Sequence, residues 1–164
     1  MSGSAQGRSD PGIASPVLLI GRYRDAIAAD AACCTPWSSN TIVDPAWTLL
    51  AALLKRDEEM AGILFCALGV GEAAWDQERP SPAGRTSGLT AEVRRVEIPA
   101  DAIAYLDATG QIGDDPTNEL EIRLTIDFPE AVTLREFGLF GGDATGEPNS
   151  GLMINHVIHE RIDL

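Results

Sequence analysis

The sequence predicts a mainly β protein: an antiparallel β-sandwich with one or two helices in the N-terminal third. Three observations point to this class. Residues 118–128 alternate strictly between apolar and polar side chains, as a strand with one buried face does. Other segments of the second half show the same period, with glycine- and proline-containing turns between them. Apolar residues at clear helical spacing occur once, at residues 44–55.

The chain begins with a stretch that is unlike the rest. Residues 1–15 are rich in Ser, Gly, Ala and Pro and predict a flexible arm, which an assembly could order by docking it on a neighbouring subunit. We expect residues 16–164 to form a single domain, long enough to bury one good core. Within it, residues 17–20 could be a short strand. The alanine-rich residues 22–32 could be a helix that Pro36 stops.

The clearest predicted helix spans about 44–56. Asp44 can cap it, and Pro45 suits its first turn. An apolar stripe at helical spacing follows, made of Trp47, Leu50, Leu53 and Leu54. The short apolar run at 62–70 then predicts a buried strand between glycines. In the long connection at 69–88, we expect Trp75 to anchor the loop to the core, with a role in an interface as the alternative.

The second half predicts mainly strands. In residues 118–128, the strongest signal in the sequence, we expect one face to lie in the core. That face consists of Leu120, Ile122, Leu124, Ile126 and Phe128. The alternation also appears at 89–98 and 132–140, but it slips by one position at Arg94–Arg95 and at Arg135–Glu136, which predicts β-bulges. Residues 151–159 predict a further strand, and residues 110–116 and 141–148 predict turns.

The charge balance bears on possible partners. The formal net charge is −13, from 25 acidic and 12 basic side chains, and Lys55 is the sole lysine. A chain without a basic patch lacks the side chains that displace counterions from phosphates. We therefore expect no nucleic-acid partner and no binding to an anionic membrane. The acidity fits solubility better than mimicry of DNA, because the acidic residues are spread out. The apolar runs are too short for membrane insertion, and the N-terminus predicts no secretory signal.

The three cysteines, Cys33, Cys34 and Cys66, do not predict a disulfide framework, because their number is odd and two are adjacent. Cys66 lies within an apolar run and is best interpreted as a small buried hydrophobic residue. This usage fits a reducing cytosol.

Few residues suggest chemistry. His156 and His159 lie near Glu160 and Asp163, which suggests a metal site, but in a strand the two histidines point to opposite faces. A calcium ion could bind a loop containing Asp143, Glu147 and Asn149, although acidic residues in turns usually serve turn geometry. Ser87 and Ser150 lie outside any nucleophile elbow, and the segments 69–71 and 138–142 do not match a phosphate loop. We therefore predict no catalytic, cofactor-binding or metal-binding residues, and no cofactor.

Glu136 lies in an otherwise apolar strand, where a buried charge needs a partner. Arg94, Arg95 and Arg123 are the candidates. The pair could be an ion pair at the sheet edge, or it could form a clamp between the sheet and a loop.

The segment Leu134-Arg-Glu-Phe-Gly-Leu-Phe-Gly-Gly-Asp143 resembles a motif of phage tail-collar and tail-fibre attachment proteins. In that motif, a strand of the form apolar-x-Glu-apolar-Gly-Leu-aromatic precedes a glycine-containing turn, and residues 151–155 resemble the return strand. Residues 89–95 resemble the family's Leu-x-x-Glu-apolar-x-Arg strand, and residues 68–71 its Gly-x-Gly turn. Residues 40–54 resemble its early helix. The likeness thus covers residues 40–164 loosely, and most of its weight comes from the order of the pieces.

The resemblance implies a non-enzymatic structural subunit of a phage tail or of a phage-tail-like contractile injection system. Family members commonly continue into a long fibre, whereas this sequence ends at Leu164, which favours a collar, baseplate or fibre-attachment adaptor. The implied partners are other copies of the chain and other tail or baseplate proteins, in a homo-oligomer or bound to a ring of three-fold or six-fold symmetry. The implied location is a virion or injection particle assembled in the bacterial cytoplasm.

We expect partners to contact the arm at 1–15 and the loop at 141–151, with exposed strand edges as a second route. Phe140 and Met153 flank that loop and could add apolar contact area, although a place in the core suits both better. Two other classes stay open. One is a small metal-dependent enzyme that uses His156 and His159. The other is a soluble ligand-binding module, which a deep apolar pocket with converging polar groups would favour.

Overall fold

The computed structural model describes Arg22, Tyr23 and residues 38–164. The predicted arm at 1–15, the possible strand at 17–20, most of the possible helix at 22–32, and Cys33, Cys34 and Pro36 lie outside the described residues. The elements are β1 (Arg22–Tyr23), β2 (Ser38–Ser39), β3 (Thr41–Ile42), α1 (Asp44–Lys55), β4 (Ala61–Gly69), η1 (Ala73–Asp76), β5 (Glu92–Glu97), η2 (Ala100–Ala102), β6 (Ile103–Leu106), β7 (Ile112–Gly113), β8 (Leu120–Ile122), β9 (Thr133–Gly142) and β10 (Leu152–Asp163).

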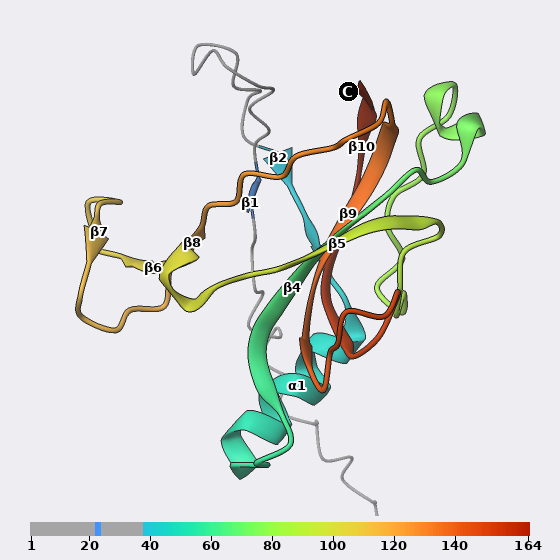
Figure 1. Ribbon diagram of the computed structural model, residues 1–164. Coiled ribbons are helices and arrows are strands. Elements are labelled where there is room, and N and C mark those ends of the chain that lie inside the picture. Colours follow the sequence, from blue (N-terminus) through green and yellow to red (C-terminus); the bar gives the residue numbers. More distant parts are fainter. Residues whose placement is uncertain (1–21, 24–37) are drawn as a thin grey trace, which may run out of the picture.

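The described chain is mainly β, with antiparallel sheets and one α-helix near its beginning, as predicted. The main sheet has the strand order β3-β10-β9-β4-β5, and all its pairs are antiparallel. A smaller sheet, β7-β6-β8, projects to one side of the main sheet (Figure 1). Arg22 and Tyr23 pair with β2, so the helix predicted from residue 22 does not begin there.

The core lies against the long central strands. Phe140 of β9 stands opposite Met153 of β10, and both are fully buried. Val43, Ala67 and Leu89 complete this cluster. The predicted strand at 62–70 is confirmed as β4, which pairs with β9 over most of its length. Placing Phe140 and Met153 in the core is also correct, so neither supplies a surface for partners.

The predicted helix forms within one residue of its expected bounds. Its N-cap, however, is Val43 rather than Asp44, and no side chain caps it. The helix buries Ala46 and Leu49. The predicted apolar stripe lies on the outer side instead, with Trp47 and Leu50 41% and 43% exposed. Among the described residues, no helix is long and apolar enough to cross a membrane.

The strand predicted at 118–128 is only partly correct. Strand pairing covers Leu120–Ile122, and the backbone of residues 124–131 makes no hydrogen bond with another described residue. The alternation of side chains persists beyond β8: Leu124, Ile126 and Phe128 are half-buried, while the residues between them are exposed. The period of two therefore identified an extended chain, but it did not identify which strand, if any, would pair with it.

The two apparent register slips have different causes. In β5, Leu68 pairs with Arg94 and Gly69 with Glu92, so the irregularity lies at Val93 rather than at Arg94–Arg95. In the β9–β10 pair, a register shift does lie next to Glu136, between the pairs Glu136–Ile158 and Leu134–Ile162, but its extra residues are on β10 rather than on β9. The slip in the sequence instead marks two polar side chains, Arg135 and Glu136, that are buried on opposite faces of β9.

Candidate functional site

A fully buried carboxylate, Glu136, joins three segments of the fold. Its Oε2 lies 2.9 Å from Nε2 of His156 on β10. The same carboxylate accepts hydrogen bonds from the backbone N–H groups of Thr90 (3.2 Å) and Ala91 (2.9 Å), just before β5. We call this arrangement the Glu136 clamp. It matches the predicted clamp between sheet and loop, but its partners are His156 and two amides, so the predicted arginine partners are wrong.

The electrostatics of the clamp follow from its hydrogen bonds. Burial disfavours the charged carboxylate, but the hydrogen bonds from His156, Ala91 and Thr90 favour it and prevail, so the pKa of Glu136 lies below its ordinary value. Nδ1 of His156 is buried and has no hydrogen-bond partner among the described residues.

Gly69 makes room for the clamp. It stands opposite both Glu136 on β9 and Glu92 on β5. A Cβ atom at this position would lie 2.6 Å from Oε1 of Glu136 and 2.8 Å from the carbonyl oxygen of Ala91. Any side chain here would therefore displace the carboxylate from the two amides.

A second buried group ties β5 to the loop at 141–151. Arg95 makes two hydrogen bonds to Glu92, of 2.7 and 2.9 Å, and both side chains are almost completely buried. Its guanidinium lies 4.3 Å from the ring centroid of Phe140, a cation–π distance. It also donates to the carbonyl oxygen of Ser150 at 3.2 Å. The Arg95 side chain is therefore enclosed between the core and the loop.

Asn149 adds a further tether from the same loop. Its side-chain amide accepts from the N–H of Leu89 at 2.8 Å and donates to the carbonyl of Leu89 at 3.1 Å. Its own backbone N–H donates to Glu92 at 2.7 Å. Asn149 has a positive φ of 54°, a conformation that asparagine tolerates better than most residues. The loop is thus fixed to the segment before β5 at several points, although most of its side chains are exposed.

The connection at 70–88 is held from the other face of β9. Arg135 donates twice to Asp76, at 2.7 and 2.8 Å, and once to the carbonyl of Val70 at 3.0 Å. The hydrogen bond from Arg135 lowers the pKa of Asp76. Trp75 is half-buried, and its ring lies against Gly71 (φ 55°), where a Cβ would collide with it. Trp75 therefore closes the turn of its own loop, and Asp76 attaches that loop to the sheet.

The residues that suggested a metal site do not come together. His156 faces Glu136, whereas the His159 ring lies 6.1 Å from the ring of Phe137, on the other face of the sheet. The prediction that the two histidines point to opposite faces is confirmed. Within Arg22–Tyr23 and residues 38–164, no group of three or more His, Cys, Asp or Glu side chains could hold a metal ion.

The remaining candidate residues are exposed in a loop, take part in structural hydrogen bonds or are buried. Asp143 and Glu147 are exposed in the loop, and the hydroxyl of Ser150 bonds to the backbone of Thr145. Cys66 is buried and free, and burial raises the pKa of its thiol to about 12, which agrees with its interpretation as a small hydrophobic residue.

An open groove of about 470 Å³ lies between the end of the main sheet and the smaller sheet. Its walls are mostly apolar, with Glu97 as the one charged residue among those that line it. The groove lacks the depth and the converging polar groups of a typical small-molecule site. Its lining residues are Ile63, Leu64, Glu97, Ile98, Pro99, Ala100, Ile103, Ala104, Tyr105 and Leu120.

Comparisons with protein-family models, with curated proteins and with solved structures found no match to this chain.

The clamp could be predicted only in part. The charge of Glu136 in an apolar strand signalled that a partner was needed. Pairing residues 134–142 with the return strand would have placed His156 beside it. The amides of Thr90 and Ala91, the position of Asn149 and the stacking of Arg95 on Phe140 left no recognisable pattern in the sequence.

Proposed function

We propose that the chain is a non-enzymatic structural subunit of a phage tail or a phage-tail-like injection particle, acting as a collar, baseplate or fibre-attachment adaptor. The observation that carries this proposal is the Glu136 clamp. It joins the two segments that resemble tail-collar and fibre-attachment proteins, residues 89–95 and 134–143. Segments that lie far apart in the sequence are thus joined through one buried side chain, as expected if both belong to the same scaffold.

The loop at 141–151 is suited to binding a partner protein. Arg95 and Glu92 of β5 hydrogen-bond to the backbone of this loop, and the side chain of Asn149 ties the loop to Leu89. These bonds fix the loop backbone while its side chains stay exposed. A rigid loop loses little conformational entropy when a partner binds. The exposed side chains include those of Asp143, Thr145, Glu147 and Pro148.

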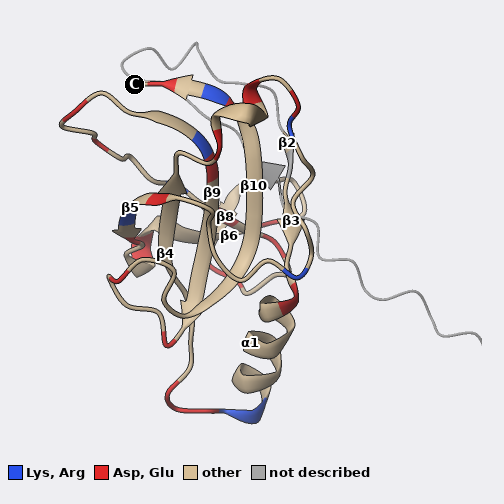
Figure 2. Ribbon diagram, turned by 90° about the vertical axis from the view of Figure 1, so that its right-hand side faces the viewer, with Lys and Arg blue, Asp and Glu red and all other residues tan. Residues whose placement is uncertain are grey.

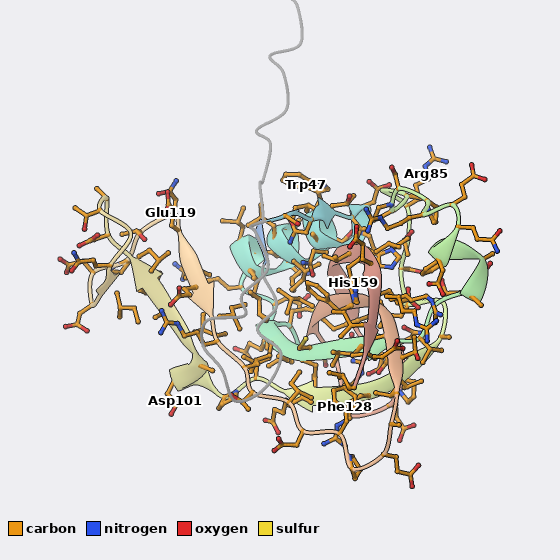
Figure 3. All side chains as sticks on the ribbon, turned by 90° about the horizontal axis from the view of Figure 1, so that it is seen from above. Trp47, Arg85, Asp101, Glu119, Phe128 and His159 are labelled. Atoms are coloured by element: carbon orange, nitrogen blue, oxygen red, sulfur yellow. The ribbon has the colours of Figure 1, made fainter. Side chains whose placement is uncertain are left out.

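Helix α1 offers a second contact surface, which we call the outer helix face: Trp47, Leu50, Leu53 and Leu54. Leu54 is 76% exposed, and the other three are between 40% and 43% exposed. Between Asp44 and Lys55 the helix carries no charge (Figure 2). Trp47 lies at the outer edge of the molecule when it is seen from above (Figure 3). An exposed apolar patch of this kind is typical of a protein–protein interface.

The proposal can be tested by asking where the protein resides. Particles are purified from the native host by sedimentation and gel filtration, and their proteins are identified by mass spectrometry. We expect the chain to co-purify with tube, sheath or baseplate proteins at a fixed stoichiometry. Finding the chain only in the fraction of free proteins, while intact particles lack it, would contradict the proposal.

A ligand-binding module is the second candidate, and the open groove near Ile98 and Tyr105 is where a ligand of such a module would bind. A panel of small apolar carboxylates, amines and sugars screened by thermal shift distinguishes the two. The adaptor role predicts no stabilisation by any of them. A saturable shift that Tyr105→Ala abolishes would favour the ligand-binding module.

A further inference from the structure

Residues 120–128 form one continuous, unpaired strand edge. β8 is the outer strand of the smaller sheet and pairs only with β6 among the described strands. Beyond it, the backbone groups of residues 124–131 make no hydrogen bond with any described residue. The segment runs from the projecting sheet, marked by Glu119, back to the main body at Phe128 (Figure 3). An extended edge of this kind is a template for another strand.

The direction of the free backbone groups follows from β8. Arg123 donates its N–H to the carbonyl of Ala102, and Glu119 accepts from the N–H of Leu106. Odd-numbered residues of β8 therefore face β6. Even-numbered residues, from Ile122 onward, direct their N–H and C=O groups to the open edge. The same period continues in the side chains, because Leu124, Ile126 and Phe128 are half-buried.

The sequence of this edge is complementary to itself. When two copies run antiparallel with Thr125 opposite Thr125, Leu124 stands opposite Ile126, and Ile122 opposite Phe128. On the outward face, Arg123 then stands opposite Asp127. Each apolar residue thus meets an apolar residue, and each charge meets an opposite charge, twice by symmetry.

We propose that residues 122–128 pair antiparallel with the same residues of a second copy, in the register centred on Thr125. The even-numbered residues form the hydrogen-bonded pairs in this register. Thr125–Thr125 and Arg123–Asp127 are the non-hydrogen-bonded pairs, whose side chains approach most closely.

The charge of the chain bears on a second copy as the partner of this strand edge. A protein of net charge −13 repels its own copies, so self-association needs a segment whose own charges balance. Residues 122–128 contain one arginine and one aspartate and are therefore neutral. Arg123 lies 2.7 Å from Glu121 of its own strand, yet its side chain stays 71% exposed and within reach of a partner. This inference does not depend on the proposed tail function.

The test exchanges the charges of the edge. Dimerisation of the full chain is measured by analytical ultracentrifugation for the wild type, Arg123→Asp, Asp127→Arg and the double variant. We expect each single variant to dimerise at least about tenfold more weakly, because like charges then face each other. The double variant, and an equimolar mixture of the two single variants, regain the wild-type constant. A wild type that stays monomeric throughout, or equal constants for all variants, overturns the proposal.

A cysteine tests the register directly. Thr125→Cys would place two thiols at a closely spaced pair, where a disulfide can form. We expect mild oxidation to yield a covalent dimer that a reducing agent dissolves. Ser81→Cys, on an exposed loop, serves as the control for chance collisions and carries the same native cysteines. Cross-linking of the Thr125 variant no faster than that of the control overturns this register.

Discussion

Glu136 and His156 form a buried pair, 2.9 Å apart, on neighbouring strands β9 and β10. The same carboxylate holds the two amides that precede β5, so one side chain connects the central hairpin to the segment that covers it. Because the group is fully buried, its partners are essential to the energetics. The first predictions concern this pair.

Glu136→Ala should lower the free energy of unfolding by about 3–5 kcal/mol, because it leaves His156 and two backbone amides without an acceptor. Urea denaturation measures the change. Glu97→Ala, which removes an exposed glutamate from β5, is the matched control and should cost less than about 0.5 kcal/mol. Equal effects of the two substitutions would show that the clamp contributes little.

The clamp should also give the fold a sensitivity to acid. Because the folded state lowers the pKa of Glu136, its stabilisation is complete above the unfolded pKa, about 4.3. This stabilisation is lost as the pH falls from the unfolded pKa through the lower pKa that Glu136 has in the folded state. The difference in unfolding free energy between wild type and Glu136→Gln should therefore shrink as the pH falls below about 4. A difference that stays constant from neutral to acidic pH would contradict this linkage.

Gly69→Ala should destabilise the protein by about 1–3 kcal/mol, because the added methyl group collides with Glu136 and with the carbonyl of Ala91. Gly62 offers a control on the same strand, since a Cβ there meets nothing within 4 Å. We expect Gly62→Ala to leave the melting temperature unchanged or to raise it slightly. If both substitutions behave alike, the close approach at Gly69 is not what constrains that position.

Arg95→Met should loosen the loop at 141–151. The substitution leaves the buried carboxylate of Glu92 without its cation, at a cost of about 3 kcal/mol. It also removes the contacts with Ser150 and Phe140. Hydrogen exchange should become faster at residues 143–150. Arg94→Met, on the exposed neighbour, is the control and should leave exchange in the loop unchanged; the reverse pattern would remove Arg95 from this role.

The outer helix face should matter for assembly and not for folding. Trp47→Ser combined with Leu50→Ser changes side chains that are about two-fifths exposed, so the melting temperature should fall only slightly. Incorporation into particles should drop severalfold, because a central aromatic anchor is lost. Thr48→Ser, at an exposed position on the same helix, is the control. Normal incorporation of the double variant would exclude this face as a contact.

The sequence predicted those parts of the fold that depend on local periodicity. The helix at 44–55, the buried strand β4 and the β9–β10 hairpin all have spacings that secondary structure imposes by itself. Periodicity failed where the outcome depends on distant partners. Residues 124–128 alternate as a strand does, but their backbone pairs with no strand of the described chain. The stripe from Trp47 to Leu54 has helical spacing, yet the sheet covers the side with Ala46 and Leu49.

The clamp shows the same limit at the level of single residues. A glutamate in an apolar strand predicts that a partner exists, because an unpaired buried charge is costly. The identity of that partner depends on register, and the permanent charge of arginine favours an arginine when the register is unknown. The structure uses His156 and two amides, while Arg95 serves Glu92 and the loop. Backbone donors have no signature in the sequence, so that part of the clamp could not be predicted.

The most direct test of the proposed tail function is electron microscopy of particles from a host in which this gene is deleted in frame. The account predicts particles that lack a collar, baseplate or fibre attachment, and wild-type protein supplied in trans should restore it. The Trp47→Ser/Leu50→Ser variant should fail to restore it. Complete and infective particles from the deletion strain would contradict the account.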